Sequence, residues 1–238
     1  MDKLYLVIPA YNEAENIQSV ICSWYPVLTG KDENSKLVVA DSESTDDTHN
    51  ILLGLQSKYP KLEVISNTGK LHGQKVIALY DFAIRSGADY IFQTDSDGQT
   101  NPDEFYEFWE MRGKYDAVIG KRLSRDDGKP REFVEHVLCK ILYMYFRILI
   151  PDANAPFRLM KAELVAKYLK KLPSDYNLPN VMLTTYFTYF KENITFKSIT
   201  FKPRQAGINS INIYKIVKIG WRALFDFCTF KKDMRKKL

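Results

Sequence analysis

The sequence predicts an α/β protein with a mostly parallel sheet and helices on both faces of that sheet. In the first half of the chain, short apolar β-rich runs alternate with longer segments of helical apolar spacing. This order is typical of parallel sheets whose strands are joined by helices. Ligands of such folds bind outside the carboxyl ends of the strands. We therefore expect the polar loops at Tyr11, Asp41, Gly69 and Asp95 to converge on one crevice.

The first half supplies the predicted parallel strands and the helices between them. Each strand is a short apolar run, and we expect strands at residues 4–8, 36–40, 62–66 and 90–94. Helices are expected at residues 14–27, 47–59 and 74–86. The second helix follows Asp46 and Asp47, which are placed to cap it.

After Asp103 the pattern changes. We expect a helix at residues 102–112, a strand at 117–120, a polar segment at 121–132, a hydrophobic helix at 133–150 and a strand at 194–202. Pro151 ends the hydrophobic helix. No linker composition or internal repeat divides the chain, so we expect a single domain.

The composition excludes several classes of protein. With 238 residues, 45% hydrophobic and 26% charged, the chain reads as an ordinary globular protein. Its net charge of +5 fits an anionic substrate or membrane surface and does not by itself imply nucleic acid. The cysteines are few and widely spaced, which argues against a disulfide scaffold or a zinc site. We expect neither a secretory signal nor a transmembrane helix.

The end of the strand at residues 90–94 carries two carboxylates and an amide. Asp95, Asp97 and Gln99 are spaced two residues apart, so in an extended chain they share one face. Their hard oxygen atoms suit Mg²⁺ or Mn²⁺, which use few protein ligands when phosphate oxygens supply the rest. The pattern therefore favours metal-assisted handling of a diphosphate. Taken alone, the acidic pair also fits a turn at the end of a strand.

Other motifs accompany the acidic pair. They are Val7 to Glu13, Ala40 to Thr48, Asn67 with Gly69 and Gly73, and Asp95 to Asp97. In this order, and each after a strand, they resemble the motifs of family 2 glycosyltransferases of the GT-A fold. The resemblance is strongest up to Gly120 and looser beyond it.

The resemblance implies a nucleotide-sugar donor site in residues 1–120. The donor-binding residues that it implies are Pro9, Tyr11, Glu13, Asp41, Gly73, Asp95 and Ser96. Strand termination also explains Pro9, and packing also explains Tyr11. Asp41 would contact the base, but Ser42 and Glu43 replace the acidic residue and glycine that the family usually has. That departure leaves the identity of the base open.

The segment from Asp95 to Gln99, with Pro102 and Glu104 after it, is similar to the polyprenyl-phosphate glycosyltransferases of the dolichyl-phosphate mannose synthase type. This resemblance implies metal ligation by Asp97 and Gln99, with Asp95 assisting. Arginine binds phosphate bidentately. We therefore expect residues 121–209 to bind the acceptor, with phosphate contacts from Arg131, Arg158 and Arg204. Each arginine also fits a solvated surface position.

The expected reaction is an inverting, Mg²⁺- or Mn²⁺-dependent transfer of a sugar from a nucleotide-diphosphate donor. The acceptor is a polyprenyl phosphate or a glycan, in cell-surface polysaccharide or glycolipid synthesis. The expected catalytic residues are Asp97, Arg122 and Asp152. A glycan hydroxyl would need a base, for which Asp152 is the first candidate and Asp175 the second, whereas a phosphate acceptor needs none. A turn after a helix explains Asp152 equally well.

Residues 210–238 read as a basic amphipathic segment. Lys215, Lys218 and Arg222 share one helical face opposite an apolar face, and a polybasic end follows. This pattern is typical of a helix that lies on anionic lipid, and it also fits a helix packed on the catalytic domain. We expect a cytoplasmic protein in peripheral contact with the inner face of the membrane. Two alternatives remain open: a sugar-phosphate nucleotidyltransferase, and a non-catalytic protein that binds a membrane surface.

Overall fold

The computed structural model describes the backbone of residues 1–123, 129–203 and 213–235. It describes the side chains of the same ranges except residues 129–133 and 213–222. The roles expected of Arg131, Arg204 and the basic face at Lys215, Lys218 and Arg222 therefore fall outside the described side chains.

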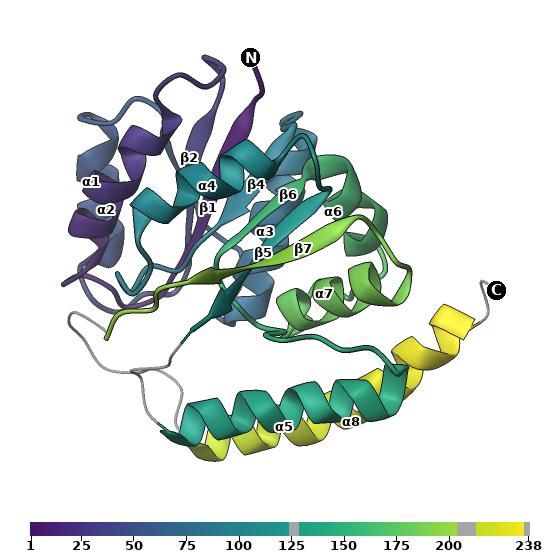
Figure 1. Ribbon diagram of the computed structural model, residues 1–238. Helices are drawn as coiled ribbons and strands as arrows, with labels where there is room; N and C mark the ends of the chain where they lie inside the picture. Colours follow the sequence, from purple (N-terminus) through teal and green to yellow (C-terminus); the bar gives the residue numbers. More distant parts are fainter. Residues whose placement is uncertain (124–128, 204–212, 236–238) are drawn as a thin grey trace.

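A seven-stranded sheet forms the centre of the molecule, in the order β3-β2-β1-β4-β6-β5-β7 (Figure 1). The strands are β1 Leu4–Ala10, β2 Lys36–Asp41, β3 Leu62–Ile65, β4 Tyr90–Gln93, β5 Ala117–Arg122, β6 Arg158–Lys161 and β7 Ile194–Ile199. Neighbouring strands are parallel except that β6 runs antiparallel to both β4 and β5. The mostly parallel sheet expected from the sequence is confirmed.

Helices cover both faces of the sheet (Figure 1). They are α1 Ile17–Trp24, α2 Thr48–Gln56, α3 His72–Arg85, α4 Phe105–Met111, α5 Lys129–Phe146, α6 Ala162–Leu169, α7 Pro179–Tyr189 and α8 Ile213–Arg235, with short 3₁₀ helices η1 Tyr25–Leu28 and η2 Pro102–Glu104. One apolar core lies between the sheet and α1, α2 and α4. The other lies between the sheet and α3, α6 and α7, and α5 and α8 extend it.

Alternate residues of β1 feed the two cores. Leu4, Leu6 and Ile8 pack on the side of α1, whereas Tyr5 and Val7 pack on the side of α3. Side chains of a strand alternate between the faces of its sheet, so a strand covered on both faces must be apolar throughout. This explains why β1 is a continuous apolar run.

The last helix packs along α5 at the bottom of Figure 1. Within its described part, Ala223, Phe227, Phe230 and Met234 are buried at helical spacing. The ring of Phe227 lies 6.0 Å from that of Phe146 on α5, and Phe230 lies 5.2 Å from Tyr176. This part of the C-terminal segment is therefore packed on the rest of the molecule through one face.

Some element predictions were wrong. The sequence did not indicate β6, α6 or α7. The expected helix at 133–150 begins earlier, at Lys129, and ends at Phe146. The next residue, Arg147, has a φ of 58°, and this left-handed conformation stops an α-helix before Pro151 is reached.

Candidate active site

The loops after β1, β2 and β4 lie side by side, because these three strands are neighbours in the sheet. Hydrogen bonds tie the loops together. The Ser96 hydroxyl donates to the Pro9 carbonyl at 2.9 Å, and the Asn12 amide donates to the Ser44 hydroxyl at 3.0 Å. The structure therefore brings most of the expected donor-site residues to one edge of the sheet.

The acidic segment after β4 contains one buried carboxylate oxygen that has no hydrogen-bond partner among the described residues. Asp95 Oδ1 is buried and accepts no hydrogen bond within the described part of the chain. Burial raises the pKa of Asp95, Arg122 opposes this shift and nearby Glu13 adds to it, and the pKa is about 6 as a result. A buried carboxylate oxygen without a donor is costly unless a ligand or cation satisfies it.

Gln99 is held with its amide oxygen available. Its Nε2 donates to the Lys202 carbonyl at 2.8 Å, and its backbone amide donates to Asp97 Oδ1 at 3.2 Å. Fixing the nitrogen in this way orients the side-chain oxygen as the remaining acceptor. Two carboxylates and one amide oxygen match the preference of Mg²⁺ or Mn²⁺ for hard ligands. Among the described residues, no three His, Cys, Asp or Glu side chains gather as a self-sufficient metal cluster.

The loop after β1 places an aromatic ring next to two lysines. The ring centroid of Tyr11 lies 4.8 Å from Lys75 Nζ and 5.5 Å from Lys70 Nζ. Glu13 is buried, accepts a hydrogen bond from Asn16 at 2.8 Å and contributes negative charge near Asp95. The loop thus combines a flat apolar surface with charge of both signs.

The carboxylate of Asp41 is buried at the end of β2. One oxygen accepts a hydrogen bond from Ser44, and the other lies 3.1 Å from Nδ1 of His49 on α2. His49 was not among the expected site residues. Its only signal in the sequence was a position shortly after the Asp41 motif, at the start of a predicted helix.

Gly73 lies in the first turn of α3 against the loop that precedes α7. A Cβ atom at this position would stand 2.2 Å from the Tyr176 carbonyl oxygen. The close backbone approach therefore requires glycine here. The contact keeps the amino end of α3 next to the loop that carries Asp175, whose side chain is exposed.

Arg122 and Asp152 form one unit at the carboxyl end of β5. Arg122 Nε and Nη2 donate to the two Asp152 oxygens, both at 2.8 Å, and Glu135 on α5 lies 3.6 Å from Nη2. The Arg122 guanidinium also lies 5.2 Å from the ring of Phe201. The sequence did not indicate Glu135 as a partner of this pair.

Arg158 stands apart from the surface of the site. The residue is 0% exposed, and its guanidinium donates to the carbonyls of Ala155 and Asn180 and to the Thr184 hydroxyl. These contacts join β6 to α7. They favour a structural role for Arg158 over the phosphate contact expected from the sequence.

Comparison with known proteins agrees with this geometry. The family model described as Glycosyl transferase family 2 matches residues 5–169. The polyprenol monophosphomannose synthase of Mycolicibacterium smegmatis is 25% identical over 242 residues, which cover 93% of this chain and 88% of that protein. The dolichol-phosphate mannosyltransferase of Pyrococcus furiosus is 32% identical over 152 residues, which cover 63% of this chain and 42% of that protein.

Solved structures share the fold. The glucosyl-3-phosphoglycerate synthase of Mycobacterium tuberculosis, crystallised with Mn²⁺, uridine diphosphate and glucosyl-3-phosphoglycerate, has a TM-score of 0.71 at 17% identity. The match covers 97% of this chain and 80% of the synthase. The family match spans most of the described sheet, including β1, β2 and β4 with their loops. The chain therefore belongs to glycosyl transferase family 2 and is a glycosyltransferase of the GT-A fold.

Proposed function

We propose that the protein catalyses an inverting, metal-dependent transfer of a sugar from a nucleoside-diphosphate donor to a polyprenyl phosphate. The observation that carries the proposal is the unpartnered, buried Oδ1 of Asp95 beside the loops of Tyr11 and Asp41. That arrangement supplies a cation site next to surfaces suited to a nucleoside. Synthesis of a cell-surface polysaccharide or glycolipid is the proposed setting.

Asp97 and Gln99 would hold Mg²⁺ or Mn²⁺, with Asp95 assisting or contacting the ribose. When bound, such a cation neutralises charge that develops on the leaving diphosphate, an effect worth several kcal/mol. The protein's own residues orient the donor. The ring of Tyr11 would contact the nucleoside. The carboxylate of Asp41 would accept a hydrogen bond from the nucleobase.

Inversion at the anomeric carbon requires an acceptor oxygen in line with the bond that breaks. The acceptor oxygen forms the new bond to carbon, and the nucleoside diphosphate leaves with the electron pair of the old one. A phosphate acceptor is already ionised at neutral pH, so no protein base has to remove a proton. The pairing of Asp152 with Arg122 supports this acceptor, because both Asp152 oxygens already accept hydrogen bonds from the guanidinium and neither is turned toward a substrate hydroxyl.

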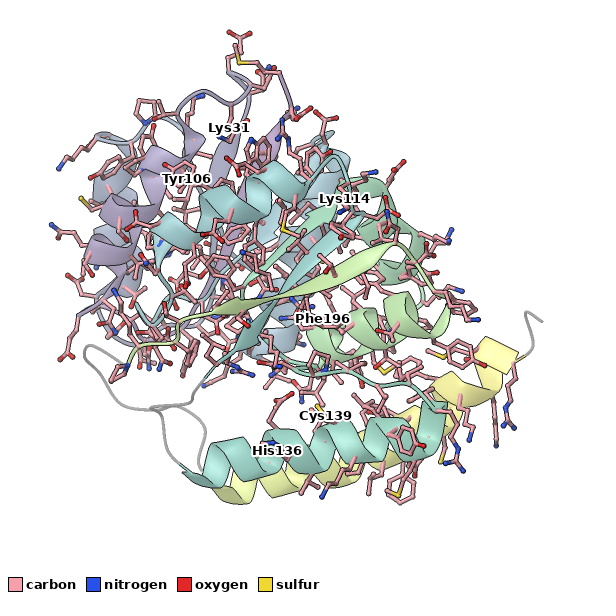
Figure 2. All side chains as sticks on the ribbon, viewed as in Figure 1. Lys31, Tyr106, Lys114, His136, Cys139 and Phe196 are labelled. Atoms are coloured by element: carbon pink, nitrogen blue, oxygen red, sulfur yellow. The ribbon has the colours of Figure 1, made fainter. Side chains whose placement is uncertain are left out.

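Two further observations support a lipid acceptor. The two enzymes from M. smegmatis and P. furiosus are named for transfer to polyprenol or dolichol phosphate. In addition, α5 and the residue that follows it carry an exposed stripe of apolar and basic side chains: His136, Val137, Lys140, Tyr143, Met144 and Arg147. No acidic residue occurs between Glu135 and Asp152. Side chains project from the side of α5 that faces away from the sheet (Figure 2).

The exposed surface continues onto α8 and the residues after α5. Leu149 is 80% exposed and Phe225 is 72% exposed. Exposed apolar groups together with basic residues match the surface of an anionic membrane. We therefore propose peripheral contact through this surface, which we call the α5–α8 face. Among the described residues, no helix has both the length and the apolar character that a membrane crossing demands.

Metal-dependent donor binding tests the proposed function. We expect one nucleotide sugar from a panel to raise the melting temperature of the full chain in the presence of MnCl₂ or MgCl₂, and EDTA to abolish that rise. A matched pair of variants sharpens the test: Asp97→Asn should abolish the rise, whereas Asp103→Asn, at an exposed residue of η2, should keep it. A sugar-phosphate nucleotidyltransferase would instead be stabilised by a sugar phosphate together with a nucleoside triphosphate. That outcome would overturn the proposal.

A further inference from the structure

The buried ammonium group of Lys75 joins the ends of two strands at the candidate donor site. Lys75 lies near the start of α3 and is 1% exposed. Its Nζ donates to the Ala10 carbonyl at 2.6 Å and to the Ser42 carbonyl at 2.9 Å. Ala10 and Asp41 are the last paired residues of β1 and β2. The Lys75 side chain therefore links the two strands just where their backbone pairing ends.

The same ammonium group faces the ring of Tyr11, with Nζ 4.8 Å from the ring centroid. A cation at this distance from an aromatic face is attracted to it. Lys75 thus contacts the residue that follows β1 and the residue that follows Asp41. Its position fixes the separation of the two loops that carry Tyr11 and Asp41.

Burying the ammonium group of Lys75 at this position costs free energy, because the group loses its hydration. Burial lowers the pKa of Lys75 to about 8, although Asp41 and Glu43 oppose the shift. An apolar side chain of similar length would avoid the loss of hydration that a buried ammonium group suffers. Apolar packing therefore does not account for lysine at this position, whereas its hydrogen bonds to Ala10 and Ser42 together with an anionic ligand nearby would.

We propose that Lys75 is a positioning residue for the donor nucleotide, which sets the loops of Tyr11 and Asp41 and so determines donor affinity. The inference rests on the proposed function, because its ligand is a nucleoside diphosphate. Within the described part of the chain, the Lys75 ammonium group donates hydrogen bonds to Ala10 and Ser42 and none to the Arg122–Asp152 pair. Removing it should therefore affect the donor and spare the acceptor.

The proposed role of Lys75 also couples donor binding to proton uptake. The negative charge of a bound diphosphate favours the charged form of a neighbouring lysine. Donor binding near pH 8 should therefore be accompanied by proton uptake. The other charged or titratable groups that face Lys75 are Asp41, Glu43, Lys70, Tyr11 and His72. A variant that removes only the lysine amine separates its proton from theirs.

The test is calorimetric titration of the full chain with UDP, GDP, CDP and dTDP in the presence of MnCl₂. We expect Lys75→Met to raise the Kd of the nucleotide that binds the wild type by about tenfold or more, since charge-assisted hydrogen bonds are lost. The KM for the acceptor should not change. Lys75→Arg, which keeps the charge, should recover part of the affinity. Lys58→Met removes a lysine that stacks on Tyr59 elsewhere and should leave the Kd unchanged.

The outcomes separate the two proposals. Wild-type protein that binds none of the nucleotides would overturn the proposed function. Nucleotide binding with the same Kd in Lys75→Met and wild type would overturn the role of Lys75 alone. If Lys75→Met does not fold, the wild type still decides, through titrations at pH 8 in two buffers with different heats of ionisation. Equal heats in both buffers mean no proton uptake and overturn the inference.

Discussion

Arg122 and Asp152 form a bidentate ion pair at the carboxyl end of β5, with both nitrogen–oxygen distances at 2.8 Å. Their side chains are only 6% and 5% exposed, and Glu135 lies 3.6 Å from the same guanidinium. One cation is therefore shared between two carboxylates in a poorly hydrated place. The sequence predicted Arg122 and Asp152 as separate catalytic groups, but in the structure they pair with each other.

Replacing Arg122 with methionine should destabilise the fold. The change removes the guanidinium that contacts both Asp152 and Glu135, and breaking a buried pair in this way costs about 3–5 kcal/mol. Urea unfolding followed by circular dichroism measures the loss. Arg85→Met is the control, because Arg85 pairs with Asp81 on the exposed side of α3 and should lose less than about 0.5 kcal/mol. Equal losses in the two variants would contradict the buried-pair account.

Asp152→Asn distinguishes a phosphate acceptor from a hydroxyl acceptor. The amide keeps an oxygen for Arg122 but cannot accept a proton, and loss of a general base typically costs about 10²–10⁴ in rate. With a phosphate acceptor we expect kcat to fall by less than about tenfold and the pH profile to keep its shape. Steady-state transfer rates between pH 6 and 9 measure both. A fall of a thousandfold would assign Asp152 as the base and favour a glycan hydroxyl.

The α5–α8 face should bind anionic vesicles through its exposed apolar groups. We expect the double substitution Tyr143→Ser and Phe225→Ser to reduce cosedimentation with vesicles that contain anionic phospholipid, because it removes apolar groups from the lipid boundary. Binding should also weaken at high salt, which screens the basic residues. Both side chains are exposed, so the melting temperature should stay close to that of the wild type.

Phe227, a buried residue on the same helix as Phe225, provides the contrasting substitution. Phe227→Ala should cost about 3–5 kcal/mol of folding stability, because Phe227 packs against Tyr145 and Phe146. Vesicle binding that survives the double substitution in full would contradict the proposed face. Loss of stability in the double variant would show that these side chains pack rather than contact lipid.

The buried amine of Lys75 should make the free energy of unfolding depend on pH. Its folded-state pKa of about 8 lies below the model-compound value of 10.5. Between these values the unfolded chain binds more protons than the folded one, so the contribution of Lys75 to stability rises with pH. The charged lysine therefore lowers stability below pH 8, and this penalty is relieved as pH rises toward 10.5.

The measurement is the free energy of unfolding of wild type minus that of Lys75→Met, from urea titrations between pH 7 and 10.5. This difference should increase by about 2–3 kcal/mol over the range, since one pKa unit corresponds to about 1.4 kcal/mol. Subtraction removes the titration of groups that the two proteins share. A flat difference would mean that burial does not perturb the Lys75 amine.

Local patterns predicted the part of the fold that brings the donor loops together. Continuous apolar runs identified β1, β2 and β4, and the polar residues after them lie at adjacent strand ends. The family resemblance was carried by residues close together in sequence within each motif. These are features that a single stretch of chain can show on its own.

Features that depend on distant contacts were not predictable. Every residue from Pro179 to Phe187 of α7 is buried, so this part of the helix has no exposed face to create a periodic signal. The strand β6 is short and antiparallel, and its first residue, Arg158, looked like a phosphate ligand until its partners on α7 were known. The bonds from Lys75 to Ala10 and Ser42 likewise join residues that no local pattern connects.

The most direct test of the central claim is transfer of labelled sugar from the stabilising nucleotide sugar to polyprenyl phosphate in vesicles. The account predicts label in the lipid phase with wild type and Mn²⁺ or Mg²⁺, none with EDTA, and none with Asp97→Asn. The label should be released by mild acid as the opposite anomer of the donor sugar. Transfer that continues undiminished in EDTA and in Asp97→Asn would contradict the metal site at the end of β4.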